Sequence, residues 1–202
     1  GVGIVYSAPQ YASDGSGNCG QLTNTIPDNT YALVTATYAG GSTAGSLIYL
    51  NGASHTTNCG AAVPVYPSNG FEIGGRTSNS FTQRIFKGII NEVIYYNGQL
   101  SATDRQRVES YLAVKYGLTK VGNYLAADGT TTFWDATANA TYHNDVTVIG
   151  RDDANPLSQL KSKSVNPTAI VTLDNGAAFT ADKSFLAVGD NAGTTTLDQT
   201  DV

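Results

Sequence analysis

The sequence predicts an all-β protein with one helix, and three observations support this prediction. Short segments rich in Val, Ile, Thr and Tyr alternate between apolar and polar residues, as strands do. Asn-Gly and other glycine-rich turn signals separate these segments. Residues 100–117 (LSATDRQRVESYLAVKYG) instead carry a helical pattern.

The first part of the chain is expected to hold several strands. Alternation and β-branched content predict a strand in TYALVTATYAG, and LIYL precedes the Asn51-Gly52 hairpin signal. FKGIINEVIYYNG reads as a long strand that ends in a second Asn-Gly turn. The expected strands are residues 2–6, 30–40, 47–50, 69–77 and 86–98.

The helix is predicted over residues 102–116. Ser101 is the expected N-cap, and Asp104 completes a variant of the capping box. Gly117 is the expected residue after the C-cap. The predicted apolar stripe consists of Val108, Tyr111, Leu112 and Tyr116, with Arg105, Gln106 and Glu109 away from it. Because a helix of this length is marginal alone, we expect it to pack on the strand at residues 86–98.

A second β-rich region is expected after residue 120. The segments DVTVIGRDD, AIVTLDNG and SFLAVGDNAG predict strands with Asp-rich ends. Residues 121–202 carry four Lys or Arg against ten acids, all of them Asp, whereas residues 1–120 are nearly neutral. We therefore expect two domains, residues 1–120 including the helix and an acidic β-rich domain at 121–202 that is truncated.

The composition indicates an extracellular protein. Only 13% of the residues are charged, and Gly, Thr, Ser, Asn and Tyr are abundant. A net charge of −5 without basic patches argues against nucleic acid as a partner. No window is apolar enough for membrane insertion. Since the chain lacks Met altogether, we expect a mature or trimmed piece of a longer protein.

The two cysteines are predicted to form a disulfide. Cys19 and Cys59 each stand in an Asn-Cys-Gly turn, separated by two predicted strands. In an extracellular protein such a bond would stabilise the fold by roughly 3–4 kcal/mol. The alternative is two unpaired thiols in a reducing compartment.

A family resemblance rests on the segments TYALVTATY, LIYLNG, FEIGGR and FKGIINEVIYYNGQLSATDRQRVESYLAVKYG. Together they resemble the end of a laminin-G/concanavalin-A-like jelly-roll module of bacterial adhesin-like surface proteins. The region from NYLAADG to the HNDVTVIGRDD run is similar to the β-rich domain that follows this module. The resemblance covers roughly residues 30–190 and implies the C-terminal part of a jelly-roll β-sandwich. The missing strands are expected before Gly1 or on another chain.

No enzymatic chemistry is expected. Retaining glycosidases of this fold need paired carboxylates, but Glu72, Glu92 and Glu109 have no acid two residues away on a strand. His55 and His143 lack a nucleophile elbow of the G-x-S-x-G type. We therefore predict a non-catalytic protein.

Ca²⁺ is the one cofactor that the sequence suggests. Asp14 and Asn18 alternate with glycine as in the start of a calcium loop, and Asp152 and Asp153 form an oxygen-rich strand end. In the alternative interpretation, Arg151 pairs with one of these acids and the others cap turns.

The ligand-binding candidates are aromatic residues in turn-rich segments, because lectin sites stack an aromatic ring on the sugar. They are Tyr11, Tyr66 and Trp134, of which Trp134 fits equally well in a core.

The best functional hypothesis is a module for adhesion, ligand binding or assembly at the cell surface. Its partners would be carbohydrate, a cell-surface ligand, neighbouring domains or copies of itself. One alternative is a carbohydrate-binding module of a secreted glycoside hydrolase. Another is a subunit of an extracellular filament or sheath that receives strands from a neighbour.

Overall fold

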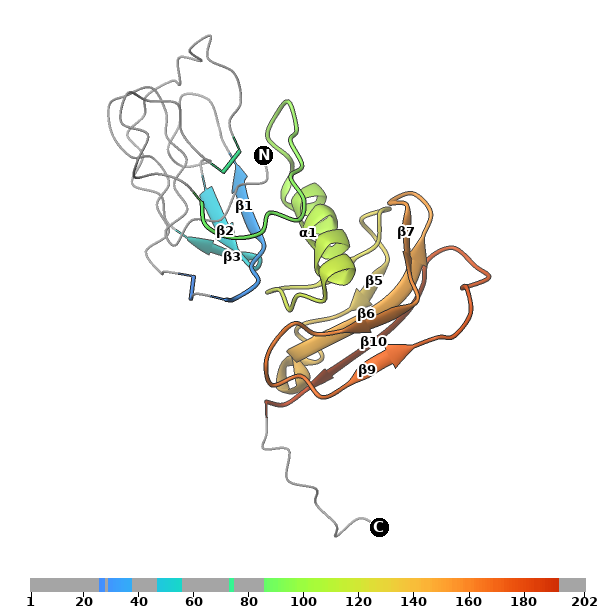
Figure 1. Ribbon diagram of the computed structural model, residues 1–202. Coiled ribbons are helices and arrows are strands. Elements are labelled where there is room, and N and C mark those ends of the chain that lie inside the picture. The colour runs from blue at the N-terminus through green and yellow to red at the C-terminus, as the bar shows by residue number, and fades with distance from the viewer. Residues whose placement is uncertain (1–25, 28, 38–46, 56–72, 75–85, 193–202) are drawn as a thin grey trace, which may run out of the picture. The chain divides into compact units, whose positions relative to one another are not determined.

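The structure is a computed structural model that describes residues 26–27, 29–37, 47–55, 73–74 and 86–192 (Figure 1). Every strand pair in this part of the chain is antiparallel, and one α-helix accompanies the strands. The predicted all-β fold with a single helix and a second domain is confirmed. The chain divides into two compact units, Gly1–Arg105 and Gln106–Val202. This division falls inside the helix, whereas the boundary predicted from the sequence lies at residue 120.

The first unit contains a three-stranded sheet in the order β1-β2-β3. Its strands are β1 (Val34–Thr37), β2 (Leu47–Leu50) and β3 (Ala53–His55). Asn51 and Gly52 connect β2 to β3 with φ angles of 48° and 81°, both in the left-handed region that a type I′ hairpin turn requires. The predicted strand at 47–50 and its Asn-Gly turn are therefore confirmed.

One face of this sheet is apolar. Val34 pairs with Leu50 and Ala36 with Ile48, so these four side chains share a face. Ile48 is 2% exposed and packs with Val34 and Ile26 in a hydrophobic cluster. Thr35, Tyr49 and Ser54 are paired across the three strands and occupy the other face.

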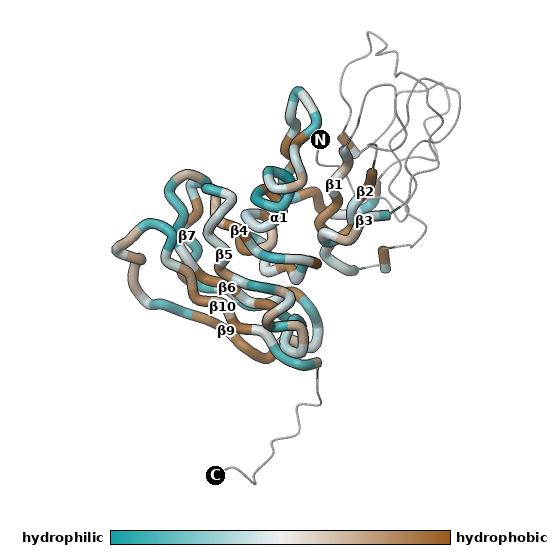
Figure 2. Tube along the Cα trace, turned by 180° about the vertical axis from the view of Figure 1, so that it is seen from behind, coloured by the Kyte–Doolittle hydropathy of each residue, from teal (hydrophilic) through white to brown (hydrophobic). Residues whose placement is uncertain are grey.

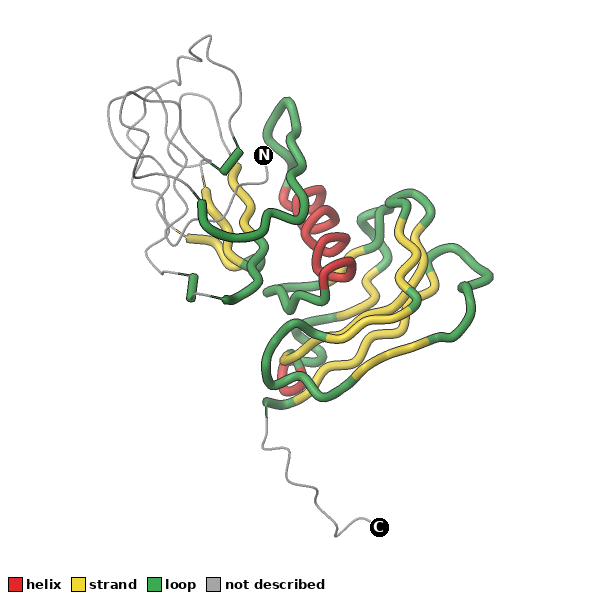
Figure 3. The backbone as a smooth tube through the Cα atoms, in the orientation of Figure 1, coloured by secondary structure: helices red, strands yellow, loops and turns green. Residues whose placement is uncertain are grey.

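Residues 86–100 do not form the strand that the sequence predicted. This segment is loop throughout (Figure 3), and its backbone enters no ladder with the other described residues. Phe86 donates its backbone N–H to Gly74, and Gly98 donates to Tyr96 in a three-residue turn. Because β-propensity reflects packing on a paired, half-buried surface, a run of Val, Ile and Tyr does not itself make a strand.

The helix α1 (Ala102–Tyr116) has the predicted bounds and the predicted cap. The Ser101 hydroxyl accepts the backbone N–H of Asp104 at 3.1 Å and donates to the Asp104 carboxylate at 2.7 Å. At the other end, Leu118 N–H bonds to Ala113 and Gly117 N–H to Val114, which is a Schellman motif.

The buried face of α1 differs from the predicted stripe. Arg105 and Glu109, which were expected to point away from the core, are 8% and 1% exposed, whereas Val108 and Tyr111 are half-buried. Figure 2 shows that much of this helix is hydrophilic, so hydropathy alone identifies its inner face poorly.

Hydrogen bonds join α1 to the segment that follows it. The Ser110 hydroxyl accepts the Leu125 N–H at 2.9 Å, and the Gly117 carbonyl accepts the Val165 N–H at 2.9 Å. The expected packing of the helix on residues 86–98 stays a prediction.

The second unit is built around a three-stranded sheet in the order β10-β6-β7 and two hairpins, β4-β5 and β8-β9 (Figure 1). The predicted strands in DVTVIGRDD, AIVTLDNG and SFLAVGDNAG correspond to β6, β9 and β10. The elements are β4 (Tyr124–Leu125), β5 (Thr132–Trp134), the 3₁₀ turn η2 (Ala140–Tyr142), β6 (Asn144–Asp152), β7 (Leu157–Gln159), β8 (Lys161–Lys163), β9 (Thr172–Asp174) and β10 (Ser184–Asp190).

The central strand β6 is covered on both faces. On one face, the Phe185 ring of β10 lies over Gly150, where a Cβ atom would overlap it, and Phe133 of β5 stacks on Phe185 at 4.0 Å between ring centroids. On the other face, the Thr147 hydroxyl accepts the Ser164 N–H at 3.0 Å. Because both faces of the strand are covered, nearly all residues of β6 are buried, and apolar and polar residues do not alternate between a core side and a solvent side.

Candidate functional site

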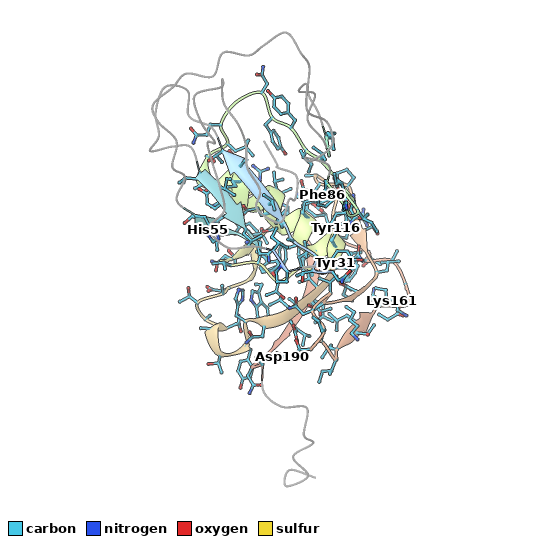
Figure 4. The ribbon with its side chains drawn as sticks, turned by 60° about the vertical axis from the view of Figure 1, so that its left-hand side comes forward. Tyr31, His55, Phe86, Tyr116, Lys161 and Asp190 are labelled. Carbon is cyan, nitrogen blue, oxygen red and sulfur yellow. The ribbon has the colours of Figure 1, made fainter. Side chains whose placement is uncertain are left out.

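The first unit exposes an aromatic side chain at one end of its sheet. Tyr31 stands just before β1 and is 53% exposed (labelled in Figure 4). Leu33 donates its N–H to the Asn51 side chain at 2.8 Å, and Asn51 returns its own N–H to the Leu33 carbonyl at 2.8 Å. These two bonds hold the segment after Tyr31 to the β2-β3 turn. The sheet end therefore presents an exposed ring beside an ordered polar turn.

Tyr49 lies on the polar face of this sheet beneath a cation. The Arg105 guanidinium sits 3.7 Å from the centroid of the Tyr49 ring, which is a cation–π contact. Arg105 is 8% exposed, so the contact is largely shielded from water. We infer that this pair stabilises the first unit and does not offer its ring to a ligand.

Asp152 is buried in the second unit. Its side chain is 1% exposed, and Oδ2 accepts the Ala127 N–H at 2.7 Å. Oδ1 is buried without a hydrogen-bond partner. A carboxylate in this position ties the end of β6 to the turn after β4.

Asp153 forms an ion pair with Arg151, the alternative that the sequence left open. The two side chains make two parallel bonds at 2.7 Å and 2.8 Å, and Arg151 also donates to the Phe179 carbonyl at 3.0 Å. The hydrogen bond from Arg151 holds the pKa of the Asp153 carboxyl below its usual range and raises the pKa of Arg151. Asp182 accepts the Asp153 N–H at 2.8 Å.

Asp128 forms a second polar cluster, with Lys183. One oxygen accepts the N–H groups of Thr130 and Thr131, and the other accepts the Thr131 hydroxyl at 2.7 Å and the Lys183 ammonium at 2.9 Å. The Thr131 N–H, followed by the Lys183 contact, holds the pKa of Asp128 well below its usual range. Asp128 also raises the pKa of Lys183.

These shifts predict the acid sensitivity of the second unit. A carboxyl with a lowered pKa in the folded state stabilises the fold above its unfolded pKa, and this contribution is lost as the pH falls through the folded pKa. We expect D128N, which keeps an acceptor for the turn but loses the charge opposite Lys183, to lower the urea midpoint at neutral pH. The difference from wild type should narrow below about pH 4.

Fluorescence of Trp134, the one Trp in the chain, follows this unfolding. D135N is the matched control, because Asp135 caps a similar turn through the Thr137 and Ala138 N–H groups. A difference that stayed constant or widened on acidification would contradict the prediction.

Trp134 belongs to the core of the second unit. The residue is 8% exposed, and its indole N–H donates to Nδ1 of His143 at 2.7 Å. The other ring nitrogen of His143 lies 2.9 Å from the Lys120 carbonyl. Because Nδ1 accepts this hydrogen bond, Nε2 is the nitrogen that carries the hydrogen, and it donates to the Lys120 carbonyl. The ring of Trp134 is therefore committed to packing and is not an exposed platform for a sugar.

Tyr124 and Lys120 extend this buried network. The Tyr124 hydroxyl accepts the Lys120 N–H at 2.9 Å and donates to the Leu118 carbonyl at 3.1 Å. Burial raises the pKa of the Tyr124 hydroxyl well above its usual range. The Lys120 ammonium, itself buried, donates to the Asn123 carbonyl at 2.6 Å and lies 4.8 Å from the Tyr124 ring centroid. The network fixes the chain between α1 and β4.

The remaining predicted site residues lie outside the described residues. They are Tyr11, Asp14, Asn18, Cys19, Cys59 and Tyr66. The disulfide and the calcium loop at residues 14–18 therefore stay predictions. Within the described ranges, no group of three or more His, Cys, Asp or Glu side chains is placed to hold a metal ion.

Sequence reasoning missed the long-range partners. The sequence DGTT at 128–131 is a recognisable signal for an Asx turn. Lys183, which pairs with the Asp128 carboxylate, lies far away along the chain and could not be identified from it. The bond between His143 and Trp134 likewise had no local signal. Tyr31 was read only as part of a strand, and its exposure could not be inferred from alternation.

Two family models match the chain, each over about half of its length. No curated protein and no solved structure shows a significant match. No helix in the described ranges has the length and apolarity needed to cross a membrane. Residues 104–202 match a domain of unknown function, DUF8202. Residues 6–104 match the concanavalin A-like lectin/glucanases superfamily, which agrees with the predicted resemblance and with a jelly-roll-like first domain.

Proposed function

We propose that residues 6–104 form a non-catalytic ligand-binding module of an extracellular or cell-surface protein, with carbohydrate as its ligand class. The match to the concanavalin A-like lectin/glucanases superfamily carries this proposal, since domains of this superfamily often bind carbohydrate or other ligands. The low proportion of charged residues is in keeping with an extracellular location.

Tyr31 is the described residue best suited to contact a ligand. Sugar rings stack on aromatic faces and bond to neighbouring amide and hydroxyl groups. Tyr31 is exposed, and the Asn51 turn lies at the same end of the sheet. Tyr11 and Tyr66 remain candidates from the sequence.

The absence of catalysis is also part of the proposal. Glycosidase chemistry needs two carboxylates about 5–5.5 Å apart in a retaining enzyme. Residues 6–104 contain only Glu72 and Glu92 as glutamates, and neither has an acid two residues away on the chain.

The test is a glycan array probed with the full chain. We expect binding at micromolar concentrations and roughly tenfold weaker binding when Y31A removes the stacking ring. Y11A and Y66A are tested beside it. Y142A is the matched control, because Tyr142 is 54% exposed but lies in the second unit.

Three results would decide between the hypotheses. Glycan binding that no variant in the first unit weakens would move the site to the second unit and overturn the proposal. Absence of glycan binding, together with filaments of the protein in electron microscopy, would favour the assembly hypothesis. Hydrolysis of a bound glycan would contradict the non-catalytic assignment.

A further inference from the structure

We propose that Asn97 is a site of spontaneous deamidation, at which water converts the asparagine into aspartate and isoaspartate. The inference goes beyond the proposed ligand binding and does not depend on it. The sequence marks Asn97-Gly98 as a hairpin turn, but the structure places no strand on either side of it. The dipeptide is therefore an Asn-Gly signal that the fold does not use for a hairpin.

The chemistry requires only water. The backbone nitrogen of Gly98 attacks Cγ of Asn97, the bond from Cγ to the amide nitrogen Nδ2 breaks, and ammonia leaves. The five-membered succinimide that results is then opened by water. Opening at one carbonyl gives aspartate and at the other gives isoaspartate, in which the backbone runs through the former side chain. Glycine favours the attack because no Cβ atom shields its nitrogen.

The surroundings of Asn97 leave this reaction unhindered. Asn97 and Gly98 are both exposed and lie in loop. Within the described part of the protein, the Asn97 side chain makes no hydrogen bond. A Cβ atom built on Gly98 would meet no atom within 4 Å, so the space around it is open. The N–H of Gly98 donates to the Tyr96 carbonyl at 2.9 Å, and this three-residue turn is the one bond that must open.

In two other Asn-Gly pairs among the described residues, a hydrogen bond restrains the asparagine side chain. Asn51 accepts the Leu33 N–H through its side-chain oxygen at 2.8 Å and stands in a turn between paired strands. Asn175 donates its side-chain amide to the Ala177 carbonyl at 2.7 Å. The backbone N–H of Gly176, whose nitrogen would have to attack, donates to the Asp174 carboxylate at 3.0 Å. The three Asn-Gly dipeptides among the described residues are thus restrained to different degrees.

The product would alter the segment that leads into α1. Either product adds a negative charge four residues before the N-cap Ser101. Isoaspartate also adds a methylene to the backbone at this point. The charge difference allows the modified and unmodified proteins to be separated by ion exchange.

The test compares the three sites in one folded molecule. The full-length protein is incubated at mildly alkaline pH in water enriched in heavy oxygen, digested, and analysed by mass spectrometry of the peptides that contain Asn51, Asn97 and Asn175. We expect Asn97 to react about tenfold faster than the other two, because the side chains of Asn51 and Asn175 must each first break a hydrogen bond of ordinary net strength, which the Asn97 side chain does not make. In urea the three rates should converge.

The variant N97Q supplies the control, because glutamine keeps the amide but cyclises slowly through a six-membered ring. Its peptide should stay unmodified while Asn51 and Asn175 react as in wild type. Equal rates at all three sites in the folded protein, or a lead of Asn97 that persists unchanged in urea, would overturn the proposal.

Discussion

Replacing Gly117 by alanine is expected to destabilise the second unit by about 3 kcal/mol or more. Gly117 follows the last residue of α1 and has a φ of +65°, a left-handed conformation that costs an L-residue with a side chain roughly 1–2 kcal/mol. A Cβ atom there would also overlap the backbone carbonyl oxygen of Lys163, which is fixed in place and unable to rotate away. Crowding of this kind in a packed interior adds roughly 1–3 kcal/mol. Urea unfolding followed by Trp134 fluorescence measures the loss.

Gly122 and Gly176 provide matched controls for this change. Both have left-handed φ angles, +81° and +64°, but a Cβ atom at either would meet nothing within 4 Å. G122A and G176A should therefore show only the conformational cost, about 1–2 kcal/mol. If G117A cost no more than these controls, the close packing of α1 on the β8 segment would be refuted.

Replacing His143 by alanine is expected to cost about 3 kcal/mol. The change leaves the Trp134 indole N–H and the Lys120 carbonyl without their partner, and each buried unsatisfied group costs roughly 1–3 kcal/mol. It also removes a stacked ring contact, since the Trp134 and His143 centroids lie 6.2 Å apart. Thermal unfolding followed by circular dichroism measures the effect without relying on Trp134.

A double-mutant cycle separates the hydrogen bond from simple loss of volume. In W134F the indole N–H is already absent, so removing His143 from this background leaves one fewer group unsatisfied. We expect H143A to cost at least about 1 kcal/mol less in W134F than in wild type. Additive effects of the two changes would mean that the bond contributes nothing to stability.

Local signals in the sequence predicted the elements whose stabilising contacts are themselves local. The α1 cap depends on Ser101 and Asp104, which are three residues apart, and the helix ends at Gly117 as predicted. The β2-β3 hairpin depends on Asn51-Gly52, whose conformation is set by the dipeptide. The strand β6 was recognisable from its run of β-branched residues.

Predictions failed where a distant partner decides the structure. Residues 86–98 have strong strand propensity but stay in loop, because propensity takes effect only on a paired surface. Arg105 and Glu109 look like the solvent side of an amphipathic helix, yet both are buried. The same distinction holds for the candidate site. The pairing of Arg151 with Asp153 was anticipated because the two residues are only two positions apart. The hydrogen bond between Trp134 and His143 was not anticipated.

The sequence by itself determined the all-β class, the single helix with its cap and its terminal glycine, and the resemblance of its first half to concanavalin A-like domains. These follow from spacings of a few residues, over which steric limits and hydrogen bonds act without help from the rest of the protein. Only the tertiary structure decided that Trp134 is core, that Asp152 is buried beneath Ala127, and that α1 bonds to the segment after it. Burial and long-range hydrogen bonds depend on which surfaces meet when the protein folds, and that information is spread over residues far apart in the sequence.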